Sequence, residues 1–178
     1  LDRDGVMNQK APRGEYVCSW EQFEWIRETR NAMKQLASEG FEFIVISNQA
    51  GVARGMIEEE ELDRIHRNLK AELASDGVKV LDFYVCPHHW DEGCYCRKPN
   101  PGMLYQASRD HLLRLDKTLF VGDDPRDCQT AWNAGCRSIF LGDSNALTSL
   151  PDNQRPDCTT SGLEGALDFI REYFTSIP

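Results

Sequence analysis

Hydrophobic and polar positions along the chain follow two alternating periods. Short runs rich in β-branched and aromatic residues are typical of buried strands, and they occur at residues 41–47, 81–85, 118–122 and 138–141. Between these runs, segments with apolar residues on one helical face predict helices over residues 58–74, 101–115 and 126–134. This alternation predicts an α/β fold: a doubly wound, Rossmann-like parallel sheet with helices on both faces.

Capping signals add two further helices to the pattern. Ser19 and Gln22 have the spacing of a capping box, which predicts a helix that starts at Ser19. Ser161 and Glu164 repeat this spacing and predict the start of the final helix. The polar, proline-containing segment 143–160 that precedes it predicts a surface loop.

The predicted elements describe one domain over residues 1–178, because no linker divides the chain. Only short segments separate the predicted strands, so no large cap domain is expected. The chain opens on Leu1, without a methionine, in what is expected to be the tail of a first strand truncated at its start. This opening leaves it undecided whether the chain is a fragment of a longer protein.

Composition limits the partners and the compartment. The net charge of −9 argues against nucleic acid as a partner, since binding to a phosphate backbone needs a basic face. No apolar run approaches the roughly 20 residues that span a membrane, and no secretory signal is visible. Seven cysteines in such a chain indicate a reducing compartment, so a cytoplasmic protein is expected. The oligomeric state is not indicated.

Polar residues gather where the predicted strands end. Ligands of an open α/β sheet bind at the carboxyl ends of its strands, where loops from neighbouring strands converge. The residues that this places together are Asp2, Asp4, Ser47, Asn48, Gln49, Lys98, Asp123 and Asp124. One such group alone is usually turn or surface chemistry. Four groups at successive strand ends favour a catalytic site.

These residue types fit metal-assisted phosphoryl transfer. Asp2 is predicted to attack phosphorus and form an aspartyl-phosphate. Asp4 is predicted to protonate the leaving oxygen and then activate the hydrolytic water. Asp2 and Asp123 offer hard oxygen ligands for Mg²⁺. Ser47 and Lys98 are predicted to hold the remaining phosphoryl oxygens, where charge builds in the transition state.

A second cluster has the spacing Cys86-x-His88-x₅-Cys94-x-Cys96. Three thiolates and one imidazole suit tetrahedral Zn²⁺, and four protein ligands predict a structural site. Unmetallated thiols are the alternative, whereas a redox site would favour the C-x-x-C spacing that is absent here. His89 could take the place of His88. The predicted zinc loop would fix the segment that leads into Lys98.

The four strand-end motifs, Asp2-Arg-Asp-Gly5, Ser47-Asn-Gln49, Arg97-Lys-Pro99 and Gly122-Asp-Asp124, resemble those of the haloacid dehalogenase (HAD) superfamily of phosphatases. The resemblance is greatest to its histidinol-phosphatase and D-glycero-D-manno-heptose 1,7-bisphosphate phosphatase branch, which keeps a zinc loop before the motif lysine. It implies that Mg²⁺ is held by Asp2, the Asp4 backbone carbonyl and Asp123, and that Asp127 orients Lys98.

The resemblance also suggests a substrate, a small phosphorylated sugar. The segments around Arg54 and Arg97 are similar to the sugar-bisphosphatase version, and imply that these arginines, with Asn48 and Gln49, bind substrate. A solvated loop arginine is the alternative for Arg54. The implied reaction converts D-glycero-D-manno-heptose 1,7-bisphosphate to heptose 1-phosphate, in lipopolysaccharide or capsule heptose biosynthesis.

Two observations keep other functions open. The x₅ spacing of the zinc motif is like that of histidinol-phosphatases, so histidinol phosphate is the alternative substrate. Asp124 stands where this branch usually has a basic residue, which removes an implied substrate contact. The departure at Asp124 and the abrupt start also leave open a non-catalytic binding domain of a larger nucleotide-sugar synthesis protein.

Overall fold

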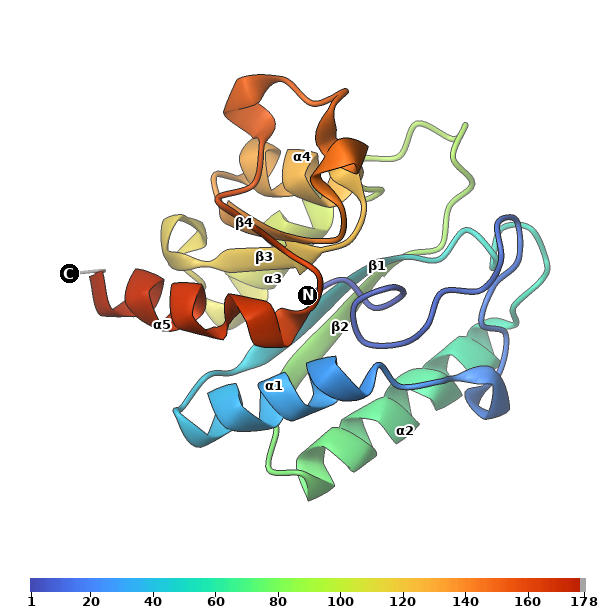
Figure 1. Ribbon diagram of the computed structural model, residues 1–178. Coiled ribbons are helices and arrows are strands. Elements are labelled where there is room, and N and C mark those ends of the chain that lie inside the picture. The colour runs from blue at the N-terminus through green and yellow to red at the C-terminus, as the bar shows by residue number, and fades with distance from the viewer. Residues whose placement is uncertain (177–178) are drawn as a thin grey trace.

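Parallel strands form the centre of the structure, a computed structural model that describes residues 1–176 (Figure 1). On one side β1 (Phe43–Asn48) pairs with β2 (Val80–Cys86). On the other, β4 (Arg137–Leu141) lies between β3 (Leu119–Gly122) and β5 (Cys158–Thr160). All of these pairings are parallel, so the predicted parallel arrangement is confirmed.

The first two residues of the chain join β1 to β3. The Leu1 amino group donates to the Ile44 carbonyl at 2.8 Å, and the Leu1 carbonyl accepts from the Ile46 N–H at 2.8 Å. On the other side, the Asp2 N–H donates to the Val121 carbonyl at 2.8 Å. The strands therefore form one layer in the order β2, β1, residues 1–2, β3, β4 and β5.

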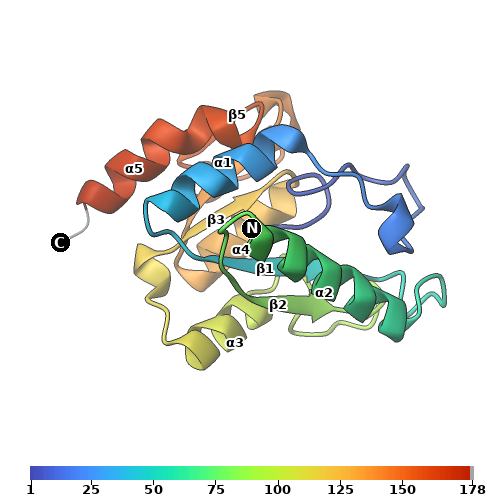
Figure 2. The same cartoon turned by 90° about the horizontal axis from the view of Figure 1, so that it is seen from below.

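Helices cover both faces of this layer (Figure 2). One face carries α1 (Arg27–Ser38), α2 (Glu59–Ser75) and α5 (Leu167–Ser176). The other carries α3 (Gly102–His111) and α4 (Pro125–Ala134). Successive strand residues point to opposite faces, so Val45 lies in the first core and Ile46 in the second. The doubly wound architecture predicted from the sequence is confirmed.

The helix predicted to start at Ser19 begins instead at Arg27. The Ser19 side chain makes no capping hydrogen bond, and residues 20–22 form a single 3₁₀ turn. Backbone pairing with a distant segment explains the difference, because the Ile26 N–H donates to the Met7 carbonyl at 2.9 Å and Ile26 stays extended. A local capping signal is outweighed by this tertiary contact.

The predicted loop 143–160 contains structure that the sequence pattern does not indicate. Its last three residues form β5 at the edge of the sheet. Earlier in the segment, Leu147 and Leu150 are buried against Cys128 and Phe140. Three residues are too few for the two-residue period of a strand to stand out, which explains why β5 was not predicted.

The final helix also begins later than predicted, at Leu167. A 3₁₀ turn precedes it, and Gly162 rather than Ser161 is the N-cap of that turn. Among residues 1–176, no helix is long and apolar enough to cross a membrane.

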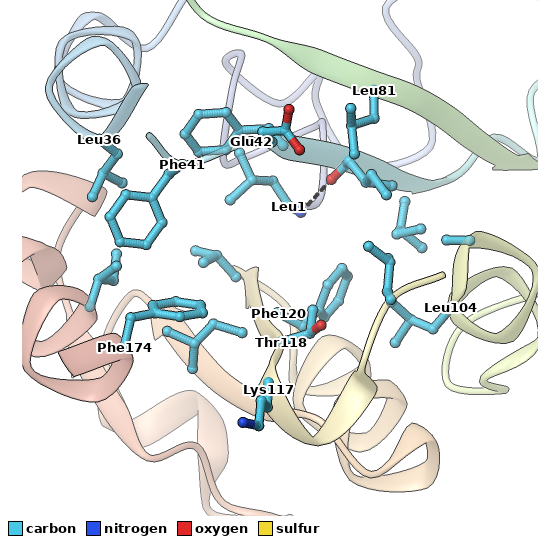
Figure 3. A pocket seen from close by; sticks show the side chains of 18 of the residues that line it. Leu1, Leu36, Phe41, Glu42, Leu81, Leu104, Lys117, Thr118, Phe120 and Phe174 are labelled. Carbon is cyan, nitrogen blue, oxygen red and sulfur yellow. Dashed lines mark hydrogen bonds between the residues drawn. The ribbon is translucent and has the colours of Figure 1, made fainter. Parts of the chain in front are cut away.

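An apolar cavity of about 450 Å³ lies at the amino ends of β1 and β3 (Figure 3). Leu1 projects into it from the middle of the sheet, with Phe41 and Phe174 on one side and Phe120 and Leu104 on the other. The cavity therefore lies at the opposite end of the strands from the polar residues described next.

Candidate active site

The polar residues predicted at the strand ends converge at the carboxyl edge of the sheet. The Lys98 ammonium lies at the centre, 2.9 Å from Oδ1 of Asp2 and 2.7 Å from Oδ1 of Asp127. Asp123 follows β3, and carboxylate oxygens of Asp2, Asp123 and Asp127 all lie within 4.8 Å of one another. The predicted orientation of Lys98 by Asp127 fits this geometry.

Burial and charge act in opposite directions on the pKa values of this pair. Burial raises the pKa of Asp2 to about 6, although the neighbouring Lys98 charge acts to lower it. Burial by itself would lower the pKa of Lys98, but the charges of Asp127 and Asp2 outweigh it and raise that pKa. Lys98 therefore keeps its positive charge at neutral pH, and Asp2 is ionised there as a nucleophile must be.

Asp4 is held by three donor residues and does not belong to the cluster of Asp2, Asp123 and Asp127. Arg3 donates to both of its oxygens at 3.1 Å, Asn8 donates at 2.9 Å and Gln49 at 2.7 Å. Burial raises the pKa of Asp4, but the Arg3 charge and these hydrogen bonds outweigh burial and lower it.

The Asp4 carboxylate is therefore a fixed, ionised group beside the reaction centre. Only its backbone carbonyl is left for the metal role that the family resemblance implies, because its carboxylate does not belong to the acidic cluster.

Asn48 and Gln49 contact catalytic groups of the protein itself. The Lys98 N–H donates to Oδ1 of Asn48 at 3.0 Å, and the Asn48 amide donates to the Lys98 carbonyl at 3.2 Å. The Gln49 amide donates to Oγ of Ser47 at 2.8 Å as well as to Asp4. Both residues also line the neighbouring cavity, so a contact with substrate remains a prediction.

A polar cavity of about 300 Å³ opens beside Asp4. Five cationic and two acidic residues line it; the acidic ones are Asp4 and Glu15. Arg3 is buried and paired with Asp4. The other four cationic residues form what we call the cationic wall: Lys10, Arg13, Arg97 and Arg126. Such a local concentration of positive charge, in a chain with a net charge of −9, suits a phosphorylated ligand. Only Arg97 was predicted from the sequence. The other three have no motif around them, and each depends on the fold to reach this wall.

Arg54 is not among the residues that line this cavity. Its guanidinium lies 5.6 Å from the centre of the Tyr16 ring and 5.5 Å from that of Trp90, and it donates to the Gly14 carbonyl at 3.3 Å. These contacts join the 10–17 loop to the zinc loop. They give no support to the predicted substrate contact.

The residues at the carboxyl edge also fit a divalent cation. Oδ1 of Asp123 is buried and has no hydrogen-bond partner among residues 1–176, while Oδ2 lies 2.6 Å from the Lys10 ammonium. Gly5 permits the close approach, since a Cβ there would lie 2.0 Å from Oδ2 of Asp123 and its φ is +90°. Asp2 and Asp123 therefore present adjacent oxygens of the type that Mg²⁺ prefers.

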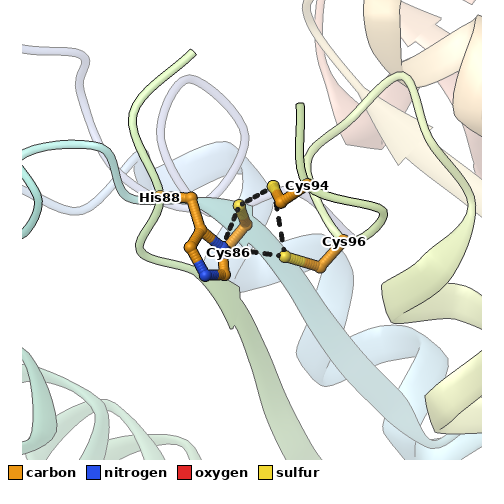
Figure 4. Close-up of side chains that lie close together, drawn as sticks. All are labelled: Cys86, His88, Cys94 and Cys96. Atoms are coloured by element: carbon orange, nitrogen blue, oxygen red, sulfur yellow. Dashed lines mark hydrogen bonds between the residues drawn. The ribbon is translucent and has the colours of Figure 1, made fainter. Parts of the chain in front are cut away.

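The predicted zinc ligands Cys86, His88, Cys94 and Cys96 also converge (Figure 4). The Cys94 sulfur lies 3.5 Å from the sulfurs of both Cys86 and Cys96, and Nδ1 of His88 lies 3.1 Å from the Cys96 sulfur. These separations exclude disulfides, whose sulfurs are about 2.05 Å apart. They approach the separation of about 3.8 Å between two ligand sulfurs in a tetrahedral site with Zn–S bonds of about 2.3 Å.

His89 does not share this site. Its backbone N–H donates to Glu92 at 2.5 Å, its ring nitrogen bonds Asp91, and its ring lies 3.7 Å from that of Trp90. Of the two adjacent histidines that the sequence offers, the structure therefore selects His88.

The loop that carries the cluster leads directly into Lys98, the lysine predicted to hold the phosphoryl group. Cys86 ends β2, and its carbonyl accepts from the Gln49 N–H at 2.8 Å. Arg97 donates to the His88 carbonyl at 3.3 Å, and Lys98 follows. The cluster therefore anchors the segment that places Lys98 beside Asp2.

Comparison with known proteins agrees with this site. Residues 95–165 match the sequence model of a family described as HAD-hydrolase-like. A D-glycero-α-D-manno-heptose-1,7-bisphosphate 7-phosphatase of Mycobacterium bovis is 38% identical over 156 residues, which cover 82% of this chain and 80% of that protein. The corresponding β-D-manno enzyme of Bordetella bronchiseptica is 34% identical over 159 residues, which cover 89% and 88%.

A solved structure supports the same relationship. The crystal structure of D,D-heptose 1,7-bisphosphate phosphatase from B. bronchiseptica, complexed with magnesium and phosphate, matches with a TM-score of 0.85 and 31% sequence identity, and the match covers 96% of each chain. Fold and site together define a HAD-like phosphatase, a phosphoric monoester hydrolase. Within that class, the chain belongs to the family of the heptose-1,7-bisphosphate 7-phosphatases.

Proposed function

We propose that the chain removes the 7-phosphate of D-glycero-D-manno-heptose 1,7-bisphosphate in a Mg²⁺-dependent reaction. The observation that carries this proposal is the arrangement of two phosphate-binding regions. Asp2 and Lys98 form the reacting centre, and the adjacent cavity has a cationic wall for a second anionic group. The names of the relatives, which include both α and β heptose bisphosphatases, support the same substrate class.

In the first step, an oxygen of Asp2 attacks phosphorus while the bond to the sugar oxygen breaks. The proton that the leaving oxygen needs comes from Asp4, whose pKa rises when the negatively charged phosphate comes to lie beside it. Lys98 and Ser47 hold the other phosphoryl oxygens, where negative charge accumulates. An aspartyl-phosphate on Asp2 is the result.

In the second step, Asp4 acts as the base. It takes a proton from a water molecule, whose oxygen attacks phosphorus and releases inorganic phosphate from Asp2. Gln49 supports both steps, because it holds Asp4 at 2.7 Å and Ser47 at 2.8 Å at the same time. Asp4 ends the second step protonated. It returns to its ionised starting state when inorganic phosphate leaves and Asp4 releases to solvent a proton that replaces the one taken up on substrate binding.

Mg²⁺ would be held by the carboxylates of Asp2 and Asp123 and by the backbone carbonyl of Asp4. When bound, it offsets the repulsion between the Asp2 carboxylate and a phosphate dianion. The buried Asp123 oxygen without a partner and the mutual proximity of the acidic groups support this assignment.

Zn²⁺ is proposed as the structural ion of Cys86, His88, Cys94 and Cys96. Burial, together with the neighbouring Cys96 thiol, raises the pKa of Cys86 to about 12, so a thiolate at Cys86 needs a cation to balance it. All seven cysteines are free of disulfides, which supports a cytoplasmic location.

Histidinol phosphate is the second candidate, favoured by the short spacing within the zinc motif. Its second functional group is an ammonium, which the cationic wall of Lys10, Arg13, Arg97 and Arg126 would repel. The charge of this wall therefore favours a bisphosphate.

The proposal is tested by phosphate release from the heptose bisphosphate and from histidinol phosphate, each with and without Mg²⁺. We expect higher kcat/KM for the bisphosphate and loss of turnover in Asp2→Asn. The reverse preference would support the histidinol-phosphate function. Absence of turnover with any phosphoester would instead favour a binding domain.

A further inference from the structure

The position that departs from the family pattern, Asp124, has a clear structural role. It is the N-cap of α4 and accepts from the Arg126 N–H at 3.0 Å, while the Asp124 N–H donates to Asp127 at 3.1 Å in a reciprocal capping box. Asp124 therefore fixes the start of the helix that carries Asp127, the partner of Lys98.

The same carboxylate also holds the Arg126 side chain. Nε of Arg126 donates to Oδ1 of Asp124 at 2.8 Å, and Nη2 donates to Oδ2 at 2.7 Å, which is a bidentate pair. The remaining nitrogen, Nη1, makes no hydrogen bond or ion pair with any residue in the range 1–176. Because the guanidinium is planar and its Nε–Nη2 edge is held by Asp124, the direction of Nη1 is fixed as well.

Arg126 belongs to the wall of the polar cavity, together with Lys10, Arg13 and Arg97. Helix stability does not explain an arginine at this place, since positive charge in the first turn opposes the helix dipole. The side chain is also half exposed, so it remains accessible to a ligand. A fixed guanidinium edge on a cationic wall is suited to a phosphate.

We propose that Arg126, held in place by Asp124, is a specificity-determining residue that binds the phosphate of the substrate that is not hydrolysed. The inference rests on the proposed function, because it assumes a substrate with two phosphates. The Asp124–Arg126 pair has no net charge, and Lys10 is paired with Asp123, so long-range attraction comes mainly from Arg13 and Arg97. Arg126 adds a directional hydrogen bond, which selects a bisphosphate over a monophosphate with the same sugar.

The test compares heptose 1,7-bisphosphate with heptose 7-phosphate in wild type and in Arg126→Gln. A hydrogen bond to a charged group corresponds to about a tenfold change or more. We therefore expect kcat/KM for the bisphosphate to fall at least about tenfold, mainly through KM, while the value for the monophosphate changes less than about threefold. Arg126→Lys keeps the charge without the paired fork, and should recover only part of the loss.

Arg137→Gln is the matched control. Arg137 forms a comparable pair with Asp157, at 2.8 Å, but at the opposite end of the strands and away from the cavity. The Arg137→Gln variant should leave the ratio of kcat/KM for the bisphosphate to kcat/KM for the monophosphate unchanged. An unchanged ratio in Arg126→Gln, or an equal fall for both substrates, would overturn the inference. No turnover of the bisphosphate by the wild type would instead contradict the proposed function.

Discussion

Lys98 and Asp127 form a buried ion pair, with 2.7 Å between Nζ and Oδ1 and side chains that are 3% and 2% exposed. The same ammonium lies 2.9 Å from the nucleophile Asp2. Asp127 thus supplies part of the charge that balances Lys98, which leaves Lys98 free to interact with a phosphoryl group as well as with Asp2.

Asp127→Asn should lower kcat at least about tenfold, because a Lys98 without its second carboxylate would pair more tightly with Asp2 and neutralise the nucleophile. The asparagine oxygen can still accept from the Asp124 N–H, so the helix start is preserved. Steady-state kinetics measures the effect. Asp116→Asn, which breaks an exposed pair with Arg114, is the control. A kcat within twofold of wild type would refute the positioning role.

His88→Ala should reduce zinc affinity by more than the roughly 10–100-fold that losing a partner of a metal ligand costs. His89→Ala should retain the metal, since His89 bonds Asp91 and lies outside the cluster. Metal analysis of the two purified variants gives the comparison. Turnover should fall with zinc content, because the loop leads into Lys98. Equal zinc in both variants would contradict the assignment of His88.

Stability should fall in mild acid because of His66. Burial, followed by the Arg3 charge, lowers the pKa of His66 from 6.5 to about 3. A depressed histidine pKa means that the unfolded chain binds the proton more readily, so the stabilisation present above pH 6.5 is lost as the pH falls. Between pH 7 and pH 5 the loss should be about 2 kcal/mol.

Urea unfolding at the two pH values tests this prediction against His66→Gln, which has no titrating ring. The variant should lose about 2 kcal/mol less than wild type over the same interval. An identical pH dependence in both proteins would show that His66 titrates normally in the fold.

Apolar residues added to the chain should fill the apolar cavity of about 450 Å³ and stabilise the fold. Three β-branched residues added before Leu1 would extend the central strand into it. Burial of each such side chain contributes about 1.5–3 kcal/mol, and ordering its backbone costs about 1–2 kcal/mol. With the middle of each range, three residues give a net gain of about 2 kcal/mol in the free energy of unfolding. An extension of three serines is the control, and equal stability of both extended chains would contradict the prediction.

The sequence predicted well that Asp2, Lys98 and Asp123 converge, because each lies at or beyond the carboxyl end of a strand segment. Asp123 directly follows β3, Asp2 ends the short first segment, and Lys98 lies on the loop after β2. Their meeting at one edge of the sheet follows once the strands are known to be parallel. The cluster of Cys86, His88, Cys94 and Cys96 depends on a short local spacing, whereas the acidic cluster of Asp2, Asp123 and Asp127 depends on the fold. The reciprocal contacts of Asn48 with the Lys98 backbone could not be predicted in the same way, since they join residues 50 positions apart in the chain.

Most residues of the cationic wall could not be predicted from the sequence. Lys10 and Arg13 lie in an irregular loop, where no period relates a side chain to a face. Arg126 has an ordinary helical context, and only its pairing with Asp124 reveals its direction. The false helix start at Ser19 has the same origin, because the deciding contact, between Ile26 and Met7, is distant in the chain.

The backbone of residues 1–2 has a structural role in addition to the proposed chemical role of the Asp2 side chain. The backbone of Leu1 and Asp2 joins the β1–β2 pair to the β3–β5 group through hydrogen bonds. The proposed reaction uses only the Asp2 side chain. A substitution of Asp2 can therefore remove its side-chain chemistry without removing its backbone pairing. A side-chain replacement such as Asp2→Asn is expected to abolish turnover while it leaves these backbone hydrogen bonds intact, so the variant should retain a bound substrate. Deletion of the same residue would open the sheet.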